Sequence, residues 1–109
     1  MTLTLSRQVS EGEFMQQVIQ LAKIMGWKVY HTQDSRKSVE GFPDLVLLRR
    51  KRMIVAELKS LSGRTTNQQT EWLNAFRVAE VQTYLWTPDD WPEIERELRA
   101  ESQIDRSHP

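Results

Sequence analysis

Two short apolar runs separated by four cations constrain the fold of this chain more than any other feature. The runs occupy residues 44–48 and 53–58, and the sequence between them at 49–52 is Arg-Arg-Lys-Arg. Strands joined by so short a connection pair antiparallel, so the sequence predicts a β-hairpin with a basic tip. Neither run alternates cleanly between apolar and polar residues, which indicates strands that are covered on both faces and lie centrally in a sheet.

Further helices and strands are predicted on both sides of the hairpin. Apolar residues recur at helical spacing after Ser10, and Ser10 with Glu13 forms a capping-box pattern at the start of that helix. Thr66 and Gln69 form the same pattern before a second helix. In chain order we expect a helix at 11–25, strands at 27–31, 44–48 and 53–58, a helix at 67–79, a strand at 81–86 and a helix at 91–100. This order predicts an α/β fold in which helices flank a four-strand mixed sheet.

The remaining segments are predicted as a buried helix stripe, a long loop and a tail. The helix at 67–79 is expected to bury Trp72, Leu73, Phe76, Val78 and Ala79. Residues 32–43 are polar, contain Gly41 and Pro43 and show no period, so they form a loop long enough to have a function. Residues 102–109 are expected to be a frayed tail.

Length and composition place limits on the class of protein. A chain of 109 residues supports one hydrophobic core, so we expect a single domain over 1–109 with its core at about 10–100. The absence of cysteine excludes disulfides and thiolate metal sites, and leaves carboxylates, carbonyls or histidine as metal ligands. No apolar run approaches the roughly 20 residues of a membrane span, and the first residues lack a signal-peptide pattern. We therefore expect a soluble, cytoplasmic protein.

The formal net charge of zero argues against a histone-like binder, but the charge is unevenly distributed. Residues 1–66 hold eleven Lys and Arg against six Asp and Glu, whereas residues 67–109 hold four against nine. Either the basic half faces a polyanion, or the two halves neutralise each other across the fold.

Three charged residues at the ends of the predicted hairpin strands carry the strongest indication of chemistry. Asp44 opens the first strand and Glu57 with Lys59 closes the second, so antiparallel pairing brings all three to one end of the sheet. Glu57 and Lys59 project from the same face, whereas Leu58 points into the core. Two carboxylates and an ammonium together can bind a divalent ion and hold a water beside it. The alternative is an Asp turn cap with a Glu and a Lys on a solvated strand end.

These residues belong to a longer ordered pattern that extends over about residues 10–100. Its seven pieces are Ser10-Glu11 with Phe14, Gly26-Trp27 with Tyr30-His31, Ser35-Arg36, Gly41-Phe-Pro-Asp-Leu45, Ala56-Glu-Leu-Lys59, Gly63-Arg64 with Gln69, and 86–91. Pro43-Asp44 and Glu57-Leu58-Lys59 resemble the signature of the PD-(D/E)xK nuclease superfamily, and the whole pattern resembles its VRR-NUC family. The chain departs from that family at Glu80, where glycine usually precedes the last strand, and at Asn67, where proline often precedes the helix.

The resemblance implies a restriction-endonuclease-like core and a DNA endonuclease that uses Mg²⁺ or Mn²⁺. Some members of the family act on branched DNA, and small stand-alone members resemble Holliday-junction resolvases. Carried over to this sequence, the resemblance makes Asp44, Glu57 and the Leu58 carbonyl direct metal ligands, with Glu11 as a further acidic residue of the metal site. Lys59 would orient the attacking water and stabilise charge on the phosphate.

Two residues of the predicted helices complete the candidate site. At about 100° per residue, Glu11 falls on the buried stripe of its helix and Glu13 on the opposite side. We therefore assign Glu11 to the site and Glu13 to the helix cap. The resemblance places Gln69 near the site as well, and the alternative for Gln69 is a structural role as the capping-box partner of Thr66.

Basic residues near the predicted site are candidate nucleic-acid contacts. We expect Arg36, Lys37 and Arg64 to contact phosphates, whereas the tip at 49–52 lies at the opposite end of the hairpin and is interpreted as a solubilising turn. His31 is assigned to nucleic-acid binding as a phosphate donor or a proton shuttle. Its alternative is a hydrogen-bonded structural histidine.

The sequence therefore favours a metal-dependent DNA endonuclease. We expect a homodimer, because one small protomer offers one site and cutting two strands needs two. One alternative is a DNA-binding module that keeps the fold without turnover, which the presence of Glu11, Asp44, Glu57 and Lys59 disfavours. The other alternative is an RNA-directed nuclease.

Overall fold

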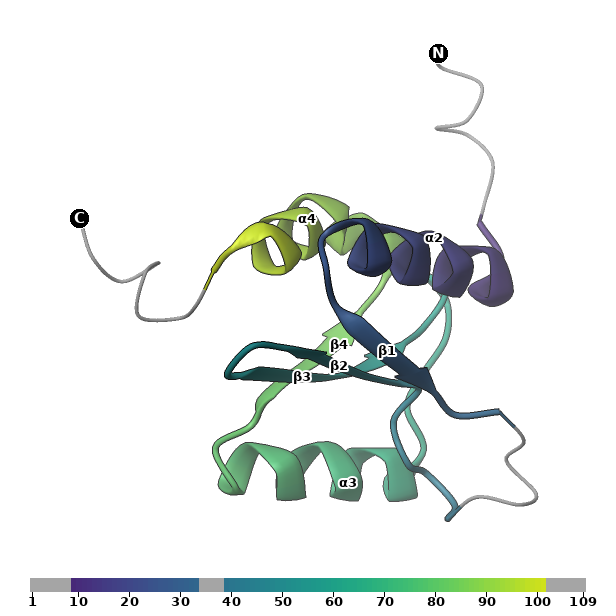
Figure 1. Ribbon diagram of the computed structural model, residues 1–109. Coiled ribbons are helices and arrows are strands. Elements are labelled where there is room, and N and C mark those ends of the chain that lie inside the picture. The colour runs from purple at the N-terminus through teal and green to yellow at the C-terminus, as the bar shows by residue number, and fades with distance from the viewer. Residues whose placement is uncertain (1–8, 34–38, 102–109) are drawn as a thin grey trace.

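The computed structural model describes residues 9–33 and 39–101. These residues form a central sheet of four strands with helices on its faces (Figure 1). The strands are β1 (Lys28–His31), β2 (Leu45–Arg49), β3 (Arg52–Leu58) and β4 (Gln82–Trp86), in the spatial order β1-β2-β3-β4. The first three are antiparallel neighbours, and β4 runs parallel to β3. The predicted mixed sheet is therefore confirmed. The predictions for Arg36, Lys37 and the tail at 102–109 concern residues outside this description.

Helices cover both faces of the sheet. They are α2 (Glu11–Ile24), α3 (Asn67–Val78) and α4 (Trp91–Arg99), with a 3₁₀ turn η1 (Pro88–Asp90) before α4. Figure 1 shows α2 and α4 side by side on one face and α3 on the other. The predicted order of helices and strands is confirmed, and in the described ranges no helix has the length and apolarity to span a membrane.

The first helix begins and ends as its sequence predicts. The Glu13 N–H donates to Ser10 Oγ at 3.1 Å, and the Ser10 N–H donates to Glu13 Oε1 at 3.0 Å. These bonds satisfy backbone donors that the first turn of a helix leaves without partners. At the other end Gly26 has a φ of 90°, a left-handed conformation that favours glycine.

Alternate side chains of β3 face different helix layers. Ile54, Ala56 and Leu58 are fully buried in the core between the sheet and the layer of α2 and α4. Glu57, one position out of phase, accepts a hydrogen bond from Gln69 of α3. The even-numbered positions of β3 thus face α2 and α4, and the odd-numbered positions face α3.

Arg49 and Arg52 lie inside the strands, which corrects the prediction of a four-cation hairpin tip. Their guanidinium carbons lie 4.6 Å and 5.1 Å from the centroid of the Trp27 ring. Arg49 Nη1 donates to the carbonyls of Met25 and Leu98, at the ends of α2 and α4. Helix C-termini present free carbonyls and a negative dipole end, so a cation there stabilises both helices. These two arginines therefore have structural roles, and only residues 50–51 form the turn.

Arg52 is also half of a buried ion pair. Its Nη2 lies 3.4 Å from Glu97 Oε1, and both side chains are at least nine-tenths buried. The same guanidinium donates twice to Gln82 Oε1, at 2.7 Å and 3.1 Å, so β3, β4 and α4 are joined through one polar cluster. A charge at this depth is tolerated when it is paired and hydrogen-bonded.

The apolar stripe of α3 is less buried than predicted. Leu73 is buried, but Val78 is 84% exposed and Ala79 is exposed. Within the described residues, α3 is the one helix on its face and has no neighbouring helix to cover its flanks. Trp72 and Phe76 pack instead against Phe42, with ring centroids 5.1 Å and 5.9 Å apart in edge-on geometry.

Replacing Arg52 should test how strongly the buried ion pair constrains the fold. We expect Arg52→Met to lower the free energy of unfolding by about 3 kcal/mol, because it removes the cation from beside the buried Glu97 carboxylate. Lys51→Met, one residue away in the exposed turn, should change stability by less than about 0.5 kcal/mol. Urea unfolding curves of both variants provide the comparison, and equal effects would contradict the structural role of Arg52.

Candidate active site

Asp44 and Glu57 lie together where β2 begins and β3 ends. The β2–β3 pairing sets Leu45 opposite Ala56, so continuing the register by one residue sets Asp44 opposite Glu57. Asp44 Oδ2 accepts a hydrogen bond from the Leu58 N–H at 2.9 Å, which ties the Asp44 carboxylate to the end of β3. The structure therefore brings the two carboxylates to one end of the sheet, on the side that α3 covers.

Lys59 lies beside the two carboxylates and forms an ion pair with Glu57. Its Nζ lies 3.4 Å from Glu57 Oε2, and its side chain is largely buried. The aliphatic part of Lys59 runs beside Gly63, where a Cβ would lie 3.3 Å from Lys59 Cδ. A side chain at position 63 would therefore crowd the lysine.

Glu57 is held in an environment that disfavours its charge. The residue is 1% exposed, and its Oε1 is buried without a hydrogen-bond partner among the described residues. Burial raises the pKa of Glu57 to about 7, with repulsion from Asp44 as the next cause and attraction to Lys59 as a partial offset. Burial raises the pKa of Asp44 as well, against the opposing effects of the Leu58 N–H and Lys59.

Gln69 makes contacts that fit both of the interpretations that the sequence left open, and its catalytic role stays a prediction. Its Oε1 accepts from the Thr66 N–H at 2.8 Å, and its backbone N–H donates to Thr66 Oγ1 at 3.1 Å, which completes the capping box of α3. Its Nε2 donates to Glu57 Oε2 at 2.9 Å. The helix cap thus fixes the amide in the orientation that contacts the buried carboxylate.

The segment before Asp44 is fitted closely to α3 and to the end of β1. Gly41 has a φ of 86°, and a Cβ there would lie 2.6 Å from the backbone carbon of Gln68. Thr32 secures the other side, because its N–H donates to the Asp44 carbonyl at 2.9 Å and its Oγ1 donates to the Pro43 carbonyl at 2.8 Å. Sequence reasoning missed the positioning role of Thr32, which no local pattern signals.

His31 lies at the same end of the sheet, on the edge strand β1. It pairs with Leu45, the residue after Asp44, and its electrostatic effect lowers the pKa of Asp44. Its Nδ1 is buried and has no hydrogen-bond partner in the described part of the chain, and its Nε2 lies 3.5 Å from the side-chain nitrogen of Gln33. The structure thus places His31 near the candidate site, and its role in nucleic-acid binding stays a prediction.

Glu11 and Arg64 are exposed and lie outside the cluster of Asp44, Glu57 and Lys59. Glu11 is exposed in the first turn of α2, on the helix layer opposite α3, although the helical wheel predicted a buried position. Side chains tilt toward the N-terminus of a helix, so a first-turn residue extends past the part of the helix that packs on the sheet. Arg64 is exposed in the connection between β3 and α3. The assignments of both residues stay predictions.

The donor set suits a hard divalent cation. Asp44, Glu57 and the Leu58 carbonyl offer oxygen ligands, which Mg²⁺ and Mn²⁺ prefer. Glu57 Oε1 is buried without a partner among the described residues, and repulsion from Asp44 adds to burial in raising the pKa of Glu57, so a cation bound between the two carboxyls would be stabilised. Within residues 9–33 and 39–101, no group of three or more His, Asp or Glu side chains is placed to hold a metal. The carbonyl and water would therefore have to complete the coordination.

Comparison with known protein families finds a match over most of the chain. The family model of the VRR-NUC domain matches residues 4–87, a range that contains α2, the whole sheet, α3 and the three charged residues of the candidate site. No curated protein and no solved structure gives a significant match.

The raised pKa of Glu57 predicts a pH-dependent stability in metal-free protein. As pH rises from the ordinary value of 4.5 toward about 7, the folded state retains a proton that the unfolded chain has lost, so this contribution to the free energy of unfolding falls. Glu57→Gln should remove the decline, which shrinks the difference in stability between about pH 5 and about pH 8 by on the order of 2 kcal/mol.

Urea unfolding in chelator at a series of pH values measures this effect. Glu71→Gln, at an exposed position of α3, is the matched control and should keep the wild-type decline. A decline that persists unchanged in Glu57→Gln would show that Glu57 is not its source.

Proposed function

Since this chain belongs to the VRR-NUC family of PD-(D/E)xK nuclease domains, we propose that it is a DNA endonuclease that depends on Mg²⁺ or Mn²⁺. One observation carries the metal dependence: the buried carboxyl of Glu57 and the half-buried carboxyl of Asp44, both of raised pKa, meet at the end of β3 with the Lys59 ammonium beside them. Such a pair repels itself without a further cation. Strongly perturbed carboxyls are a common mark of catalytic sites.

In this proposal Asp44, Glu57 and the Leu58 carbonyl hold the metal. The bound ion would supply an acidified water and positive charge beside the scissile phosphate. Lys59, 3.4 Å from Glu57, orients the attacking water and offsets the negative charge that the pentacovalent phosphorus gains. Gln69 acts as a positioning residue, because its amide holds one oxygen of Glu57 and leaves the other free for the metal.

The proposed substrate is branched DNA, and the proposed active form is a homodimer. Each chain offers one pair of site carboxylates, whereas cutting both strands of a duplex or junction requires two sites. Arg36, Lys37 and Arg64 are proposed to contact phosphates around the site, since neutralised phosphates supply most of the affinity that does not depend on sequence.

Cleavage assays test the proposed function. Labelled linear, flapped and four-way DNA should be cut in the presence of Mg²⁺ or Mn²⁺, and excess chelator should abolish the cutting. A Lys59→Met variant, purified in the same way, controls for contaminating nucleases and should lose nearly all activity while still binding DNA. Full activity in chelator, or cleavage of matched RNA in place of DNA, would overturn the proposal.

The assignment of Glu11 is tested against its neighbour Glu13. Glu11→Gln should nearly abolish metal-dependent cleavage with the fold retained, because a carboxylate of the metal site is lost. Glu13→Gln should leave cleavage near the wild-type rate and cost about 1 kcal/mol of stability or less, because it weakens the cap with Ser10. Rates and melting curves of both variants decide between them, and an active Glu11→Gln variant would remove Glu11 from the site.

A further inference from the structure

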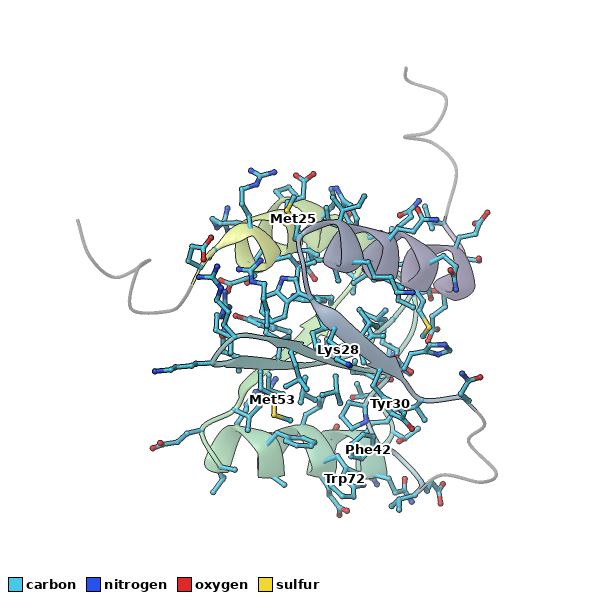
Figure 2. All side chains as sticks on the ribbon, in the orientation of Figure 1. Met25, Lys28, Tyr30, Phe42, Met53 and Trp72 are labelled. Carbon is cyan, nitrogen blue, oxygen red and sulfur yellow. The ribbon has the colours of Figure 1, made fainter. Side chains whose placement is uncertain are left out.

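Part of the sheet face that carries Glu57 and Lys59 is not covered by α3. Within the described residues, helix α3 packs on β3 and β4, and β1, β2 and the start of β3 carry exposed side chains on the same face. Tyr30, Leu48 and Met53 are 57%, 46% and 37% exposed there, and Figure 2 shows Tyr30 and Met53 on the α3 side of the sheet. Together with the exposed Lys28 we call these residues the open face.

The open face is continuous with the candidate active site. Cross-strand partners share a face, so Tyr30 lies in one row with Val46, and Lys28 lies in the next row with Leu48. The row of Asp44 and Glu57 is the neighbour of the Tyr30 row, because Asp44 lies two residues before Val46, the partner of Tyr30. Successive rows are about 7 Å apart. An extended ligand that runs from the two carboxylates along β1 would therefore meet Tyr30 first and Lys28 second.

A basic pocket adjoins the far end of the open face, because Lys28 and Leu48 belong to both. The pocket has a volume of about 410 Å³ and is lined by Met25, Gly26, Lys28, Leu48, Arg49, Arg50 and Glu101. Three of these residues are cations and one is an anion. Glu101 pairs with Arg50 at 3.3 Å, whereas the exposed Lys28 has no ion-pair partner in the described part of the chain. The pocket thus retains positive charge.

We propose that the open face binds an unpaired strand of the nucleic-acid substrate. In this arrangement, which rests on the proposed function, a base stacks on Tyr30 while the following phosphate enters the basic pocket beside Lys28 and Arg50. An exposed aromatic ring followed by cations is the combination that holds single strands without sequence preference. A second copy of the chain could also cover the apolar side chains, but it would give no reason for the cations at the end of the row.

Binding measurements in chelator test this proposal without cleavage. Fluorescence anisotropy with a single strand, a duplex and a flapped duplex compares wild type with Tyr30→Ala, Tyr30→Phe and Lys28→Gln. We expect Tyr30→Ala to bind the single strand and the flap about ten-fold more weakly, with the duplex changed less than about two-fold. Tyr30→Phe, which keeps the stacking surface, should bind like wild type.

Lys28→Gln tests the phosphate contact, and Lys23→Gln is its matched control on the helix layer away from the open face. Lys28→Gln should weaken single-strand binding and reduce the slope of log affinity against log salt by about 1, whereas Lys23→Gln should leave both unchanged. Circular dichroism melting curves establish that each variant is folded.

The outcomes separate this proposal from the proposed function. If Tyr30→Ala binds the single strand as tightly as wild type, and the protein cuts DNA, the strand site on the open face is overturned and the nuclease proposal stands. Tyr30-dependent binding in a protein that cuts nothing overturns the nuclease proposal and supports the strand site. A change of oligomeric state in Tyr30→Ala by size-exclusion chromatography, with unchanged affinity, would identify the open face as an interface between copies and overturn the proposal.

Discussion

The register between β2 and β3 is the constraint on which the rest of the structure depends. A turn of only two residues, Arg50 and Lys51, sets Arg49 opposite Arg52 and fixes every later pair of the hairpin. Arg50 takes a φ of 56° to make this turn. Side chains alternate along a strand, so a slip of one residue would send Arg52 toward α3 and Glu57 into the apolar core. The helix layers and the candidate site therefore follow from one register.

Strand β3 carries two buried ionisable side chains, Arg52 and Glu57, whose surroundings differ. Arg52, at the start of β3, pairs with the Glu97 carboxylate and donates hydrogen bonds to the Gln82 side chain and to the Glu97 carbonyl near the end of α4. Glu57, near the end of β3, faces Asp44 and has one oxygen without a partner among the described residues. The first charge is compensated and fixes the packing of α4. The second lacks such compensation, and burial together with repulsion from Asp44 raises the pKa of Glu57 to about 7.

Helix α3 buries few of its side chains, although its Gln69 contacts the Glu57 carboxyl of the candidate site. Leu73 is its one buried side chain in the described structure, and the helix is held at its N-terminal end by other means. Gly41 lies against its first turn, Phe42 packs on Trp72, and Gln69 reaches Glu57. The loop before Asp44 and the helix after Lys59 therefore stabilise each other around the two carboxylates. The partial cover by α3 also leaves the open face exposed beside them.

The sequence by itself determined the features that depend on neighbours within a few residues. The capping boxes before α2 and α3 were predicted because each spans three residues, and strand parity placed Glu57 and Lys59 on one face because that alternation is a local property. Hairpin geometry then predicted that Asp44 meets them at one end of the sheet. The order of elements and the mixed sheet were predicted on the same local evidence.

Only the tertiary structure decided which charges are buried and which surfaces remain open. Arg49 and Arg52 resembled a solvated tip because their partners lie far along the chain, at Trp27 and in α4. The exposure of Val78, the contact of Gly41 with Gln68 and the link from Gln69 to Glu57 likewise depend on where α3 settles. Burial is a property of the packed layers, and a single sequence specifies those layers only through contacts between residues that are distant along the chain.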